Sequence, residues 1–163
     1  MTEEAGRAYR KALFILERRD YTQAELQRKL LDKGFSSESI TEAIDKLKEY
    51  DFINDRRFVE QYLRYYCFGK SKRVLSMKLL LKGIPTELFD VVYEELKTEL
   101  ECEPEQEALQ QAVNAALRKA ERKGYALDAL PSEEKNRIVA ALYRKGFPVA
   151  KIQHELRKAT VSQ

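Results

Sequence analysis

The side chains best suited to chemistry in this sequence are cations, and the chemistry open to them is the binding of anions. Between positions 54 and 86 the chain has eight lysine and arginine residues against two carboxylates, a net charge of +6. No acidic residue occurs between Gln61 and Thr86. Such a segment attracts phosphate backbones or acidic protein surfaces. Its candidate binding residues are Arg64, Lys70, Lys72, Arg73 and Lys78.

An acidic block and a second basic block follow this segment. Residues 87–116 carry nine acidic side chains and one basic, whereas residues 117–163 carry 11 basic and five acidic. Arg144, Lys145 and Lys151 in the second basic block complete the candidates for binding DNA or a protein partner. The acidic block could instead neutralise the basic run inside the molecule. Both interpretations stay open, and we expect the basic run to meet a partner.

Four aromatic residues adjoin the basic run: Tyr62, Tyr65, Tyr66 and Phe68. Aromatic rings beside cations can stack on unpaired bases. Their spacing of three and four residues is also typical of a helix face that packs against a neighbour. We expect packing to be their main role, and stacking remains the alternative.

The residues that usually build catalytic or metal centres are scarce. The chain has one histidine, His154, and two cysteines, Cys67 and Cys102. They have no metal-ligand spacing, and no phosphate-loop or nucleophile-elbow motif occurs. We therefore predict a protein that is not an enzyme and has no catalytic residue, metal or cofactor. We expect His154 on the surface of the last helix, and the two cysteines as buried small side chains or incidental surface thiols.

The elements that position these residues are predicted to be helices. The composition is 44% hydrophobic and 35% charged, with only 6 Gly and 4 Pro, and helix-forming residues dominate. Frequent turn residues, which all-β folds need, are missing. This composition indicates an all-α fold.

A recurrent Lys-Gly-apolar marker divides the chain into three units. It occurs at Lys33-Gly34-Phe35, Lys82-Gly83-Ile84 and Lys145-Gly146-Phe147. Shifts of 49 and 112 residues bring the surrounding apolar positions into register, which is typical of a helical repeat array. We predict an elongated, curved tandem array of three three-helix repeats. Their predicted bounds are 1–53, 54–98 and 99–163, the last with an acidic linker at its start.

Local signals predict where the helices begin and end. Thr22-Gln23-Ala24-Glu25 is a capping box, and the glycine of each marker suits a left-handed helix stop. Other helix starts are predicted at Ser36, Asp55, Ser71, Pro85, Pro104, Pro131 and Pro148. The markers are therefore interpreted as helix caps rather than contact residues.

The second and third helices of each unit resemble a helix-turn-helix reader of DNA. The third helices of the first two units are acidic, however, and would be repelled from a major groove. Only the last helix, with Lys151, Arg157 and Lys158, could dock there. We do not expect sequence-specific readout.

The expected compartment is a reduced cytoplasm. The apolar runs are far shorter than the ~18 residues of a membrane-spanning helix, and the acidic start lacks a signal peptide. Two cysteines do not suggest a disulfide framework.

The order of several motifs resembles the bacterial RecX regulators over nearly the whole chain. The segment from Arg18 to Leu26, with Lys29-Leu30 and Gly34-Phe35, resembles the family's first repeat. The junction motif is similar to residues 52–58, the second repeat to residues 69–84 and the weaker third repeat to residues 137–156. Two features depart from the family pattern: the acidic stretch from Glu99 to Glu107, and Lys70 after Gly69.

The resemblance implies a modulator of the RecA recombinase. It implies binding to RecA and to its filament on single-stranded DNA, with inhibition of ATP hydrolysis, strand exchange and coprotease activity in DNA repair and the SOS response. Direct DNA contact, a monomeric state and no membrane association are further expectations. The alternatives are a DNA-binding helical regulator unrelated to RecA and a purely structural adaptor.

Overall fold

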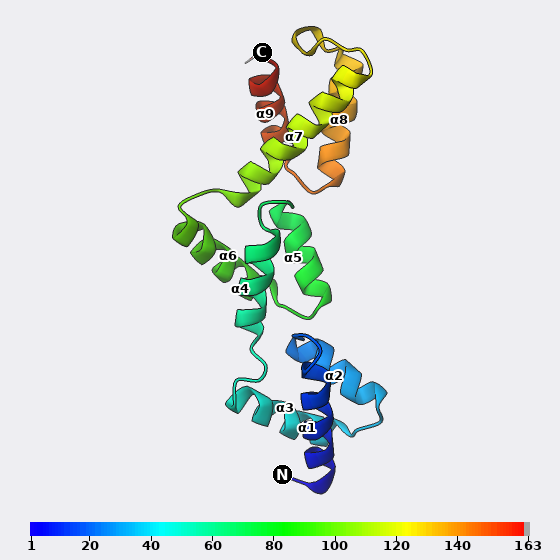
Figure 1. Ribbon diagram of the computed structural model, residues 1–163, viewed down its shortest axis with the longest axis vertical. Coiled ribbons are helices and arrows are strands. Elements are labelled where there is room, and N and C mark those ends of the chain that lie inside the picture. The colour runs from blue at the N-terminus through cyan, green and yellow to red at the C-terminus, as the bar shows by residue number, and fades with distance from the viewer. Residues whose placement is uncertain (162–163) are drawn as a thin grey trace. The chain divides into compact units, whose positions relative to one another are not determined.

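The computed structural model describes residues 1–161 and is all-helical in that range, as Figure 1 shows. Three consecutive groups of three α-helices follow one another, so the predicted all-α class and three-helix repeats are confirmed. The helices are α1 Glu3–Leu16, α2 Gln23–Asp32, α3 Ser37–Glu49, α4 Asp55–Tyr66, α5 Lys72–Leu81, α6 Thr86–Leu100, α7 Pro104–Arg122, α8 Ser132–Arg144 and α9 Val149–Val161, with a short 3-10 helix η1 at Leu127–Ala129.

The first three helices enclose their own apolar core. Its buried members recur at helical spacing along α1, α2 and α3: Ala12, Leu26, Leu30, Ile40, Ile44, Leu47 and, beyond α3, Ile53. Glu4 links α1 to the start of α3. Its carboxylate accepts hydrogen bonds from the hydroxyls of Ser36 and Ser39, each at 2.8 Å. These hydrogen bonds lower the pKa of Glu4.

The last three helices enclose a second core. Pro104 occupies the first turn of α7, where its missing N–H costs nothing, and the helix continues to Arg122. The buried side chains of this core are Ala108, Leu109, Val113, Leu117, Ala120, Leu127, Leu130, Ile138, Leu142, Phe147, Ile152 and Leu156.

The chain forms two compact units, and the helices of the middle group contribute to both. The first unit contains Met1–Tyr62 and Lys78–Leu96; the second contains Leu63–Met77 and the residues from Lys97 onward. The repeat bounds 1–53, 54–98 and 99–163 therefore stay a prediction. Each unit is described by itself below.

The helix ends follow the local signals. The capping box at Thr22 and Glu25 is present, and Ser36 caps α3 through its hydroxyl. The marker glycines Gly34, Gly83 and Gly146 have φ of +86°, +85° and +94°, so their interpretation as left-handed stops is confirmed. Two carboxylate residues, Asp51 and Glu101, hold the same conformation without being glycine.

A pair of hydrogen bonds joins α2 to the helices of the next group inside the first unit. The hydroxyl of Thr22, which caps α2, donates to the carbonyl oxygen of Lys82 in the second marker. The backbone N–H of Gln23 donates to Asp55 Oδ1, at the start of α4, over 2.8 Å. We call this arrangement the first joint.

The same arrangement recurs inside the second unit. The hydroxyl of Ser71, which precedes α5, donates to the carbonyl oxygen of Lys145 in the third marker over 2.8 Å. The backbone N–H of Lys72 donates to Glu105 Oε1, in the first turn of α7, over 3.1 Å. This is the second joint, and each joint satisfies helix N-terminal donors with groups from the following repeat.

Two marker glycines are needed for close approach as well as for their positive φ. A Cβ on Gly83 would overlap the side chain of Ala24, and a Cβ on Gly146 would overlap the hydroxyl of Ser71. A Cβ on Gly34 would meet no atom within 4 Å. The glycine therefore allows two segments to touch at each joint, whereas at Gly34 it serves the turn alone.

Candidate interaction surface

A hollow of about 320 Å³ lies where the second joint brings the start of α5 against the end of α8. It has both apolar and cationic walls. Its lining residues are Gly69, Lys70, Ser71, Val74, Ala112, Lys145 and Phe147. Two predicted binding residues from distant parts of the sequence, Lys70 and Lys145, therefore line one hollow.

Neither of these lysines is neutralised by a carboxylate among residues 1–161. Lys145 is exposed, and its ammonium group makes no hydrogen bond or ion pair there. Lys70 is half-buried, and its Nζ lies 5.9 Å from the ring centroid of Tyr66. The positive charge of both side chains is available to a bound anion.

An exposed pair of tyrosines accompanies Lys70. Tyr65 is 82% exposed and Tyr66 36% exposed, and their rings meet edge to face with centroids 4.7 Å apart. The expectation that they mainly pack is wrong for these two residues. The helix buries Val59 and Leu63, four residues apart, and Tyr65 lies off that face. Tyr62 and Phe68 are half-buried.

Two other predicted binding residues already have internal partners. Arg64 forms an ion pair of 2.6 Å with Glu99, and its hydrogen bond lowers the pKa of that carboxyl group. Lys151 lies 3.5 Å from Glu105. The pairing of Arg64 agrees with the internal-pairing interpretation of the basic run. Lys151 lies outside that run, and its partner also comes from the acidic block.

The remaining candidates differ in their surroundings. Arg73 and Arg144 are exposed, and within the described residues neither makes a hydrogen bond or an ion pair. Lys72 is half-buried at the first position of α5, and its backbone N–H donates a hydrogen bond to the carboxylate of Glu105. Lys78 is exposed and belongs to the first compact unit. Lys70, Arg73, Arg144 and Lys145 are thus the candidates of the second unit whose charge no carboxylate offsets.

The acidic stretch from Glu99 to Glu107 is mostly helical. Residues 101–103 alone separate α6 from α7, so the predicted linker is a short turn. Glu105 and Glu107 lie in the first turn of α7, where negative charge favours the helix dipole. Glu103 pairs with Lys97 at 2.9 Å. This stretch therefore provides internal counter-charges.

The side chains associated with catalysis show no arrangement for it. Cys67 is fully buried, and burial raises the pKa of its thiol; burial also raises that of half-buried Cys102. Both are held away from the nucleophilic thiolate form. His154 is exposed on α9, as expected. Residues 1–161 contain no cluster of three histidine, cysteine or carboxylate side chains that could hold a metal ion.

No helix in the described part of the chain combines the length and the apolar character that crossing a membrane requires.

Sequence reasoning identified the cations but missed the hollow and the exposed tyrosines. The hollow depends on the Ser71–Lys145 hydrogen bond between distant segments, for which no local pattern exists. The outward position of Tyr65 had a local signal, because Val59 and Leu63 already mark the buried face of α4.

Residues 8–47 match the family model for the first three-helix domain of RecX. The regulatory protein RecX of Caldanaerobacter subterraneus is 37% identical over 98 residues, which cover 57% of this chain and 48% of that protein. The regulatory protein RecX of Haemophilus influenzae strain PittEE is 35% identical over 86 residues, covering 50% of this chain and 55% of that protein. The chain thus spans about half the length of the curated relatives it matches.

Two solved structures have the same fold. The crystal structure of RecX from Lactobacillus salivarius aligns with a TM-score of 0.79 at 24% identity, over 97% of both chains. Another crystal structure of regulatory protein RecX aligns with a TM-score of 0.75 at 18% identity, over 93% of this chain and 70% of that one. The first three-helix domain of this chain thus matches that of RecX, and the chain is similar to curated RecX regulatory proteins over about half of its length.

Proposed function

We propose that this chain regulates a RecA recombinase. It binds RecA and the RecA filament on single-stranded DNA, and it lowers ATP hydrolysis, strand exchange and coprotease activity, thereby modulating DNA repair and the SOS response. The observation that carries the proposal is the similarity of this chain to RecX regulatory proteins, including the match of residues 8–47 to the first three-helix domain of RecX. The expected place of action is the cytoplasm, where the chain works as a monomer.

The surface of the second unit supports this proposal physically. A nucleoprotein filament carries phosphate and carboxylate groups, and the unit presents Lys70, Arg73, Arg144 and Lys145 without local counter-charges. A regulator of this kind acts through binding free energy alone, because a ligand shifts an equilibrium by its differential affinity for the two states. It needs no catalytic residue, metal or cofactor. Capping of filament growth and binding along the filament groove are both compatible with such a surface.

The direct test is the single-strand-dependent ATPase of RecA. Substoichiometric amounts of the chain should slow hydrolysis in low salt. An unchanged rate at an equimolar ratio would contradict the proposed function. ATP hydrolysis by the chain alone would contradict the view that it is not an enzyme.

A triple variant tests the surface. Lys70→Glu, Arg73→Glu and Lys145→Glu together should weaken binding to the RecA filament at least tenfold, or about 1.4 kcal/mol. The matched control reverses three exposed cations of the same unit, Arg118, Lys119 and Lys135, none of which makes an ion pair within residues 1–161. The control should keep most of the affinity. Equal losses in both variants would indicate a general charge effect and exclude this surface.

The exposed tyrosines favour one alternative function, a DNA-binding regulator unrelated to RecA. Tyr65 and Tyr66 next to Lys70 have the composition of a stacking surface for unpaired bases. The two functions separate in one comparison of binding curves. A RecA regulator binds the filament more tightly than bare single-stranded DNA, whereas the alternative predicts equal affinity for the two.

A further inference from the structure

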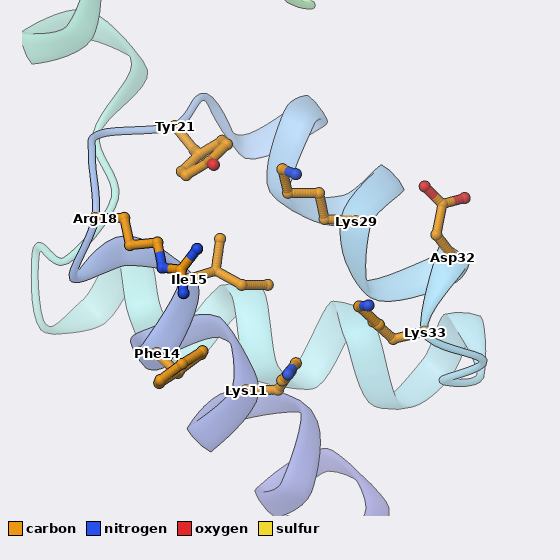
Figure 2. Close-up of a pocket in the computed structure, with 8 residues that line it drawn as sticks. All are labelled: Lys11, Phe14, Ile15, Arg18, Tyr21, Lys29, Asp32 and Lys33. Atoms are coloured by element: carbon orange, nitrogen blue, oxygen red, sulfur yellow. The ribbon is translucent and has the colours of Figure 1, made fainter.

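A second hollow of about 320 Å³ lies in the first unit, between the end of α1 and the face of α2, as Figure 2 shows. None of its residues is among the binding residues predicted from the sequence. The hollow is lined by Lys11, Phe14, Ile15, Arg18, Tyr21, Lys29, Asp32 and Lys33.

The walls of this hollow carry a large excess of positive charge. Four of its lining residues are cations and one, Asp32, is acidic. Within residues 1–161, none of the four cations forms an ion pair. Nearby Arg19, which does not line the hollow, lies 3.9 Å from Glu25. Positive charge that no ion pair within residues 1–161 neutralises therefore surrounds the hollow.

An exposed aromatic ring lies among these cations. Phe14 is 51% exposed, since α1 buries Ala5, Ala8 and Ala12 instead. Lys11 Nζ and Arg18 Cζ lie 5.2 and 5.7 Å from the Phe14 ring centroid. Figure 2 shows Arg18 above the ring and Lys11 to its right. A phenylalanine at such a position leaves apolar area in water that a flat partner could cover.

Stabilisation of the fold explains only some of the cations around Phe14. The contact of Lys11 with Phe14, three residues away on α1, stabilises that helix modestly, and Arg18 reaches the same ring from the turn that follows α1. Lys29 comes from α2 and Lys33 is the residue that caps its end, however, and Lys29 Nζ lies 5.3 Å from the ring centroid of Tyr21. Like charges from two helices around one hollow repel each other, and a bound anion would remove that repulsion.

We infer that this hollow binds a short single-stranded segment of nucleic acid. An unpaired base stacks on the ring of Phe14, and the adjoining phosphates meet Lys11, Arg18 and Lys29. The exposed ring favours this ligand over an acidic peptide, since a carboxylate gains nothing from an aromatic face. Duplex DNA fits poorly, because its bases are already stacked. The inference does not depend on any action on RecA.

The test uses the full chain and a fluorescently labelled oligothymidylate, without recombinase, at low salt. Fluorescence anisotropy should report binding that Phe14→Ala weakens about tenfold, as expected for the loss of one base–aromatic stack. Phe14→Tyr should keep the affinity. The matched control is Tyr50→Ala, which removes a ring that is 58% exposed and lies under a lysine in the same unit.

The charge is tested separately. The double variant Arg18→Glu and Lys29→Glu should weaken binding at least tenfold and make its salt dependence shallower. The control double variant Lys46→Glu and Lys48→Glu has the same charge change on α3. Thermal unfolding checks that each variant folds. If Arg18→Glu/Lys29→Glu does not fold, the charge-neutral Arg18→Gln and Lys29→Gln pair replaces it.

Competition distinguishes the possible ligands. Unlabelled oligothymidylate should displace the probe more effectively than the matching duplex or polyglutamate. Displacement by polyglutamate with equal strength and an unchanged affinity in Phe14→Ala would indicate an acidic protein segment and overturn the inference. Failure to bind the oligonucleotide would also overturn it, and normal inhibition of RecA in that case would leave the proposed function intact.

Discussion

The two joints share their backbone geometry but treat their marker lysines differently. In the first joint Lys82 Nζ lies 2.9 Å from Glu25, which belongs to the first turn of α2. In the second joint the corresponding first-turn position of α5 is occupied by Val74. The backbone N–H of Val74 donates to the Ser71 hydroxyl oxygen, as the backbone N–H of Glu25 donates to the Thr22 hydroxyl oxygen. Lys145 therefore has no counter-charge among the residues that the structure describes.

This difference separates structure from binding. The hydroxyl and the glycine, which both joints have, hold the segments together. The first-turn side chain decides whether the marker lysine is used internally or is available to a partner. One joint is thus purely structural, and the other is structural and a candidate binding surface at once.

The largest expected effect comes from the joint glycines. Gly83→Ala combines a positive φ with overlap against Ala24, so it should lower the free energy of unfolding by about 3 kcal/mol. Gly34→Ala, at the same φ in open space, should lower it by only about 1 kcal/mol. Urea denaturation of both variants measures the difference. Equal losses of unfolding free energy would mean that the close approach of Gly83 to Ala24 does not contribute to stability.

The joint hydroxyls come next. Thr22→Val and Ser71→Ala each remove a helix cap and the hydrogen bond to a marker carbonyl, at positions that are buried. Each should lower the free energy of unfolding by about 2 kcal/mol. Similar losses of unfolding free energy in the two variants would indicate that the two joints contribute equally to stability. A loss in Thr22→Val alone would show that the second joint is weaker. Thr41→Val, at an exposed site on α3, serves as the control.

Glu25→Gln removes only the charge that distinguishes the first joint. Burial opposes ionisation of Glu25, but hydrogen bonds from Lys82 and Thr22 and the nearby positive charge together lower its pKa below the ordinary value of 4.5. The carboxylate therefore adds stability above pH 4.5, about 1 kcal/mol for a partly buried pair, and this is lost as the pH falls through the lowered pKa.

Unfolding curves at pH 7 and near pH 3 measure this effect. The free energy of unfolding should be larger for wild type than for Glu25→Gln at neutral pH. The two values should converge in acid, because the protonated carboxyl group resembles the amide. A difference that does not depend on pH would contradict the ion pair. Glu38→Gln, at an exposed site, should show no such dependence.

The smallest effect on stability should come from Val74→Glu, which gives the second joint the carboxylate of the first. The free energy of unfolding should change by less than about 0.5 kcal/mol, because the charge pair gained with exposed Lys145 offsets the loss of the half-buried valine side chain. Binding to the RecA filament should fall about threefold, because Lys145 gains an internal partner. Unchanged binding would place the contact surface away from Lys145.

Local chemistry was readable in the sequence, and tertiary pairing was not. The capping box at Thr22 and the stop at Gly83 depend on a few consecutive residues, so their patterns sufficed. The pairing of Arg64 with Glu99 crosses 35 positions and requires the fold itself. The sequence therefore predicted the helices and repeats well. It could not separate neutralised cations from available ones, and it missed the hollow beside Phe14.

The joints also explain how so much sequence change is compatible with one architecture. In each joint the hydroxyl donates to a main-chain carbonyl oxygen, which every residue possesses and no substitution can delete. Each contact demands only a small hydroxyl on one side and a glycine on the other. Most exposed positions of such a chain can therefore change without loss of the fold. Similarity at 18–24% identity with TM-scores of 0.75–0.79 is what this freedom should produce.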